Sequence, residues 1–147
     1  MKDGKINKKD VLFEDKEKKI GFGILDSDDY LIILEGRFIE VSKNKFPLIG
    51  LLPLLQLDSL ILKKKIEEKG LVFYDVVPVE KILLTAFDDR FSLFWKEVAL
   101  DWIVKLKYNS PQIVSVLLKK SSIDSNLPKD FKFRIKKAMK QIEEESR

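Results

Sequence analysis

The residues of this chain that are best suited to chemistry are four carboxylates close together in sequence. Asp88, Asp89, Glu97 and Asp101 fall within fourteen positions, and the last two are spaced to share one face of a helix. Such a pair can exchange protons with a substrate or bind a divalent metal ion through oxygen atoms. The same spacing also occurs on solvated helices, where a basic neighbour such as Lys105 offsets the repulsion between the two acids. We favour the solvated helix.

The side chains that perform most enzymatic chemistry are missing. The 147 residues include no histidine and no cysteine. A thiol nucleophile, a disulfide, an imidazole base and an ordinary zinc site are therefore excluded. From this composition we expect a protein that is not an enzyme and that carries no metal and no cofactor.

Two short motifs resemble ligand-binding loops without completing them. Gly21-Phe22-Gly23 lacks the third glycine, the lysine and the following helix of a phosphate loop, and indicates a strand where two backbones approach closely. The acidic run at 26–29 lacks the glycine and the downstream glutamate of a calcium loop. We interpret it as a hairpin turn.

The positive charge of the chain is concentrated towards its C-terminus. The net charge is +4, but residues 103–147 contain eleven basic and five acidic residues. A basic face attracts nucleic acid, anionic lipid or an acidic protein, although a solvated lysine-rich helix is the simpler interpretation. The alternative function that follows is nucleic-acid binding through the last helix, by Lys129, Lys132, Arg134, Lys136, Lys137 and Lys140.

Two tryptophans seven positions apart, Trp95 and Trp102, lie on one face of a helix predicted over about 90–107. Tryptophan is enriched at binding hot spots, so a candidate partner-binding site consists of these two residues with Asp88 and Asp89. The tryptophans also continue an apolar stripe at three- and four-residue spacing, which favours a position in the core.

The elements that must position these residues form an α+β fold. Strands are predicted at 21–25, 30–34 and 37–41 as an antiparallel meander, with a fourth strand at 71–74. A helix follows Pro53 and ends before Gly70, a short helix begins at Pro78, and further helices begin at Pro111 and Pro128. We therefore expect a small N-terminal antiparallel sheet of three to four strands packed on a helical C-terminal half, with three to four helices in antiparallel hairpins.

The expected organisation is a single domain over 1–147. It consists of a charged flexible arm at 1–19, pinned by Val11-Leu12-Phe13, a mixed β and helical part at 20–77, and a helical part at 78–147. The most apolar stretch, 46–62, is interrupted by prolines and polar residues, so no membrane span is expected. With no signal peptide and no cysteine, we expect a cytoplasmic protein.

The function that best fits these observations is protein–protein interaction without catalysis. Small inhibitors and immunity-type proteins that neutralise a partner share this size, this mixture of helix and strand, and this absence of catalytic motifs. That similarity is one of class, and the motifs identify no family. The partner itself is not specified by the sequence.

Overall fold

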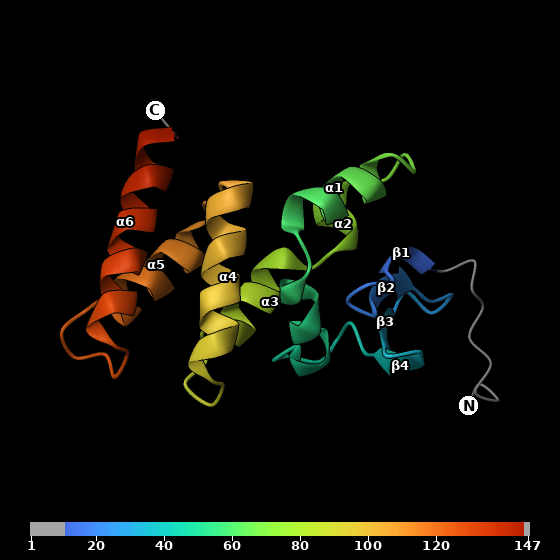
Figure 1. The fold of residues 1–147 in the computed structure, drawn as a ribbon, viewed down its shortest axis with the longest axis horizontal. Helices are drawn as coiled ribbons and strands as arrows, with labels where there is room; N and C mark the ends of the chain where they lie inside the picture. Colours follow the sequence, from blue (N-terminus) through green and yellow to red (C-terminus); the bar gives the residue numbers. More distant parts are fainter. Residues whose placement is uncertain (1–10, 146–147) are drawn as a thin grey trace. The chain divides into compact units, whose positions relative to one another are not determined.

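A computed structural model describes residues 11–145 and confirms the α+β class (Figure 1). The chain divides into two compact units, 1–82 and 83–147. The boundary falls inside helix α3, Val79–Ala86. The predicted single domain stays a prediction.

The first unit contains a four-stranded antiparallel sheet with the strand order β1-β2-β3-β4. Its strands are β1, Val11–Asp15; β2, Ile20–Ile24; β3, Tyr30–Leu34; and β4, Arg37–Val41. The predicted three-strand meander is confirmed. β3 lies between β2 and β4, and its Leu31, Ile32 and Ile33 are all buried, as expected for an interior strand. Most side chains of β4 are partly or fully exposed, as expected for an edge strand with a wet side.

The fourth strand is β1, which comes from the segment expected to be an arm. Residues 11–15 pair with β2, while residues 1–10 of the predicted arm lie outside the described residues. The predicted close approach at Gly21 is confirmed here, because a Cβ on Gly21 would lie 3.0 Å from the carbonyl oxygen of Phe13 on β1.

The predicted strand at 71–74 is wrong. Residues Phe73–Val76 form the short helix α2, which follows the 3₁₀ helix η2, Ile49–Gln56, and helix α1, Ser59–Glu67. α1 packs against β1 and α2, and η2 packs against β2. β1 pairs with β2 and β4 pairs with β3 at the two edges of the sheet. Residues 71–74 therefore do not contribute a strand to it.

The second unit is helical. After α3 come α4, Leu93–Leu106; α5, Pro111–Lys120; and α6, Lys129–Glu145. α6 packs against both α4 and α5, and α4 and α6 run in the same direction in Figure 1. The predicted stripe of α6 is confirmed, since Phe131, Ile135, Ala138 and Ile142 are buried. Among the described residues, no helix combines the length and the apolar character that a membrane crossing requires.

One helix of this unit is less buried than its sequence suggests. α5 is apolar on most sides and is therefore predicted to be central, yet it buries only Ile113 and Leu117 completely. Leu118 is 57% exposed. Val114 and Val116 are partly exposed, so α5 buries one narrow stripe and the prediction of a central helix is wrong.

Candidate binding surfaces

The four neighbouring carboxylates, Asp88, Asp89, Glu97 and Asp101, do not converge on a common site. Each forms an ion pair with a basic residue of its own, at distances of 2.9 Å for Asp88 with Arg90, 3.3 Å for Glu97 with Arg134, and 3.4 Å for Asp101 with Lys105. Asp89 pairs with Lys120 of α5. Among residues 11–145 there is no group of three or more carboxylates that could bind a metal ion. The carboxylates therefore act here as partners in ion pairs.

A buried lysine organises the loop that carries Asp88 and Asp89. Lys96 of α4 is only 2% exposed, and its Nζ donates hydrogen bonds to the carbonyl oxygens of Asp88, at 2.9 Å, and Phe91, at 2.5 Å. Burial lowers the pKa of the Lys96 ammonium, and the positive charge of Lys120 lowers it further. This residue was missed in the sequence because a single lysine on a helix gives no sign that it will be buried.

The acids of this loop are stabilised in their ionised form. Hydrogen bonds from the Arg90 side chain and backbone lower the pKa of Asp88 to about 2. A hydrogen bond from Lys120 lowers the pKa of Asp89. Both candidate partner-binding acids are thus charged at neutral pH and already paired within the second unit.

The two tryptophans have different environments. Trp102 is fully buried, as the alternative of a core position predicts, so its side chain does not reach the surface. Trp95 is partly exposed and makes an edge-to-face contact with Phe94, with ring centroids 5.0 Å apart. Of the two, only Trp95 is accessible at the surface.

The buried face of α4 is only partly the predicted one. The sequence pattern predicts a core stripe of Phe91, Phe94, Trp95, Val98, Trp102 and Leu106, of which only Trp102 is fully buried. The other buried residues of α4 are Lys96, Ala99, Leu100 and Ile103. Phe94 is 47% exposed, and Phe91, Trp95 and Val98 are partly exposed. We call these four residues the α4 apolar stripe. The α4 apolar stripe thus places Trp95 in a group of neighbouring apolar side chains at the surface.

Polar groups border the α4 apolar stripe. The guanidinium of Arg90, held by Asp88, lies 5.8 Å from the centroid of the Phe91 ring. The ion pair between Asp101 and Lys105 lies further along the same helix. An apolar centre with a charged border is the usual composition of a protein-binding surface.

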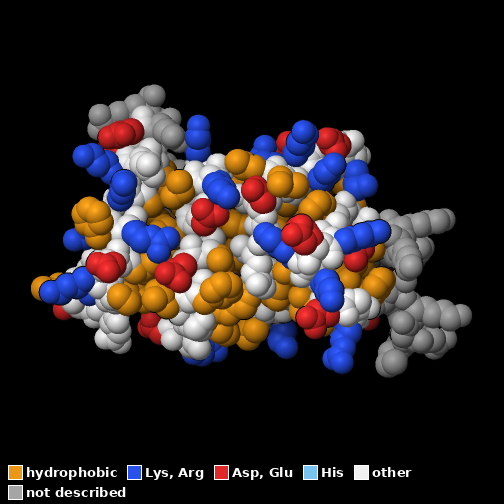
Figure 2. Space-filling view, in the orientation of Figure 1, with side chains coloured by type: hydrophobic (Ala, Val, Ile, Leu, Met, Phe, Trp, Pro, Cys, Tyr) orange, Lys and Arg blue, Asp and Glu red, His pale blue; other side chains and the backbone are white. Residues whose placement is uncertain are grey.

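The basic residues of α6 fall into two groups. Arg134 pairs with Glu97, and the Nζ of Lys132 donates to the carbonyl oxygen of Ile123. The other four, Lys129, Lys136, Lys137 and Lys140, are exposed and form no ion pair within the described part of the chain. At the left of Figure 2, in the region of α6, basic side chains lie among hydrophobic and acidic ones.

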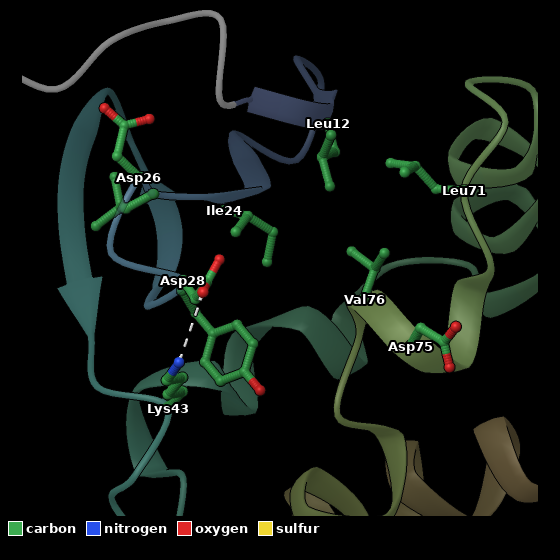
Figure 3. A pocket seen from close by; sticks show the side chains of 10 residues that line it. Leu12, Ile24, Asp26, Asp28, Lys43, Leu71, Asp75 and Val76 are labelled. Atoms are coloured by element: carbon green, nitrogen blue, oxygen red, sulfur yellow. Dashed lines mark ion pairs between the residues drawn. The ribbon is translucent and has the colours of Figure 1, made fainter.

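A hollow of about 730 Å³ in the first unit has no counterpart in the sequence analysis (Figure 3). Leu12, Leu71 and Val76 border one side of it, and on the other side Asp28 faces Lys43 at 3.7 Å. Burial and the charge of Asp29 raise the pKa of Tyr30, which also lines it. The hollow joins segments about sixty positions apart, so no local motif could have predicted it. The carboxylate of Asp28 in this hollow is already paired with Lys43.

Comparison of the chain with models of protein families, with curated proteins and with solved structures found no match.

Proposed function

We propose that this protein binds another protein, without catalysis, through the α4 apolar stripe. The observation that carries the proposal is the exposure of Phe94 beside the partly exposed Trp95, on a helix whose other face already forms the core of its unit. Aromatic side chains that remain accessible after the core is complete are typical of binding hot spots.

The spacing of the stripe indicates the kind of partner. Phe94, Trp95 and Val98 lie on α4 at positions i, i+1 and i+4, and Phe91 lies just before the N-cap residue Ser92. Apolar side chains gathered in this way along one side of a helix are typical anchors of a helix that lies in an apolar groove. We therefore infer a partner with such a groove. The Arg90–Asp88 pair at the border would fix the orientation of the complex more than it would add affinity. A small inhibitor or immunity-type protein would use this mode of binding to block its target.

The test is affinity purification of the tagged full chain from its native cells, with nuclease and high salt, comparing the unaltered protein with two variants. Phe94→Glu places a charge in the α4 apolar stripe, and Leu118→Glu places one on the exposed side of α5. We expect one stoichiometric protein to co-purify with the unaltered chain and with Leu118→Glu, and to be lost with Phe94→Glu.

The recovered partner is then titrated against the purified variants by calorimetry. A hot-spot residue costs about 2 kcal/mol or more when truncated, which corresponds to at least about 30-fold weaker binding for Phe94→Ala or Trp95→Ala. Circular dichroism of each variant verifies that the helices are retained. Equal binding by Phe94→Glu and Leu118→Glu, or the absence of any stoichiometric partner, would exclude this function for the stripe.

A further inference from the structure

We propose that the outward face of α6 binds single-stranded nucleic acid, with its lysines on the phosphates and Phe133 stacked on an unpaired base. This surface, which we call the α6 basic face, consists of Lys129, Phe133, Lys136, Lys137 and Lys140. It lies on a different helix from the α4 apolar stripe. The two proposals can therefore fail independently.

The lysines of the α6 basic face have no acidic partner within the described part of the chain. Its four lysines are exposed and form no ion pair among residues 11–145, whereas Arg134 on the flank of the same helix pairs with Glu97. At about 100° per residue, Lys129, Lys136 and Lys140 lie opposite the buried Phe131 stripe, with Lys137 beside them. Unpaired lysines aligned along one helix face complement a phosphate backbone, which is bound mainly by such charges.

The aromatic residue on this face makes the inference more specific. Phe133 is 69% exposed, and its position on the helix places it among the four lysines. Covering this exposed apolar ring with a ligand would remove apolar surface from water, which is favourable. Stacking of a base on the ring would do so, and only an unpaired base offers an accessible face. Single strands are therefore favoured over duplexes.

A membrane surface would also attract these lysines, but the geometry of α6 does not favour it. A helix that lies in a bilayer interface turns its apolar stripe towards the lipid. The apolar stripe of α6, which includes Phe131 and Ile135, is instead buried against its own unit. A bilayer would receive only Phe133 from this helix.

The test measures fluorescence anisotropy of labelled 20-nucleotide oligo(U) and oligo(dT), and of a 20-base-pair duplex, with the full chain at several salt concentrations. If four phosphates are contacted, the logarithm of the binding constant should fall with the logarithm of salt concentration with a slope of about −3. Lys136→Glu with Lys140→Glu should reduce the magnitude of this slope by about half. Phe133→Leu, which keeps an apolar side chain but removes the ring, should weaken single-strand binding about 5- to 150-fold.

A matched control separates the site from the general positive charge of the protein. Lys16→Glu with Lys45→Glu changes the net charge by the same amount at two exposed positions of the first unit. We expect it to leave most of the binding intact, and thermal melts confirm that all variants are folded.

Three results would overturn the proposal. The first is no binding to either oligonucleotide at about 20 mM salt, where electrostatic binding is strongest. The second is equal loss of binding in the control and in the α6 variants, or no effect of Phe133→Leu. The third is binding to vesicles of phosphatidylcholine and phosphatidylserine, sensitive to the same α6 substitutions, without binding to the oligonucleotides. That result would assign the face to anionic lipid.

Discussion

The Nζ of Lys96 lies 2.9 Å from the carbonyl oxygen of Asp88, so a buried ammonium on α4 is bound to the backbone of the loop that precedes the helix. The carbonyl oxygen of Phe91 accepts a second hydrogen bond from the same Nζ. This arrangement supports the loop from which the Asp88–Arg90 pair and the Phe91 end of the α4 apolar stripe project.

Lys96→Met should therefore destabilise the protein. Methionine has a similar length but no donor. The carbonyl oxygen of Asp88 keeps its hydrogen bond from the Phe91 nitrogen, at 3.1 Å, whereas the carbonyl oxygen of Phe91 loses its bond to Lys96, at a cost of about 1–3 kcal/mol in the free energy of unfolding. Lys105→Met, which removes a lysine from an exposed ion pair on the same helix, should change this free energy by less than about 1 kcal/mol. Urea unfolding of both variants provides the comparison. If Lys96→Met proves equal to or more stable than the unaltered protein, desolvation of the ammonium outweighs its hydrogen bonds.

The pair between Asp88 and Arg90 should contribute stability that depends on pH. The pKa of Asp88 is about 2 in the folded protein and 3.8 in its ordinary state, so the folded form binds fewer protons between these values. The contribution is present above pH 3.8 and is lost as the pH falls towards 2. Because Asp88 is about one-third exposed, solvent screening limits it to about 1 kcal/mol or less.

Asp88→Asn should accordingly lower stability at pH 6 and have little effect at pH 2, as measured by thermal or urea unfolding. Asp26→Asn, at an exposed turn position, supplies the control. An Asp88→Asn effect of the same size at both pH values would show that the pair does not depend on the charge of Asp88.

The N-cap residues of α1 and α4 differ in whether their side chains bond to the helix, and the second serves as a control for the first. Oδ1 of Asp58 accepts hydrogen bonds from the backbone nitrogens of Leu60, at 2.9 Å, and Ile61, at 3.2 Å, at the start of α1. Asp58→Ala should cost about 0.5–2 kcal/mol, and Asp58→Ser should restore most of it. Ser92 holds the equivalent position before α4 but forms no such bond, so Ser92→Ala should cost less than about 0.5 kcal/mol. Chemical denaturation distinguishes the two caps, and equal costs would contradict this assignment.

The contact between η2 and β4 should not tolerate a methyl group at Gly50. A Cβ on this glycine would lie 2.7 Å from Cγ2 of Val41, whose branched side chain is stiff and buried. Gly50→Ala should therefore lower stability by about 1–3 kcal/mol. In the double variant with Val41→Ala the clash is removed, so the combined loss should be smaller than the sum of the single losses. Melting temperatures of the four proteins test this, and additive losses would show that the two sites do not interact.

Several features of the fold could be predicted because they depend on residues close together in sequence. The turns of the sheet were marked by Asp26–Asp29 and by Glu35-Gly36, and Asp28, Glu35 and Gly36 do adopt positive φ angles there. Ser110 before Pro111 is a sequence signal for the start of a helix, and its hydroxyl accepts a hydrogen bond from the Ile113 nitrogen. Such interactions span no more than four residues, so a single chain contains all the information they require.

Other features were decided by contacts between distant segments. Residues 11–15 form an edge strand because they pair with the edge of β2 that β3 does not occupy. Residues 73–76 are helical although their composition suits a strand. On α4 the apolar residues cover an arc wider than one neighbouring surface can bury. The sequence by itself therefore determined an apolar helix with two tryptophans. Only the tertiary structure decided that Trp102 enters the core while Phe94 and Trp95 stay at the surface, because periodicity places Trp95 and Trp102 on one face but does not define how much of the length of that face the rest of the chain covers.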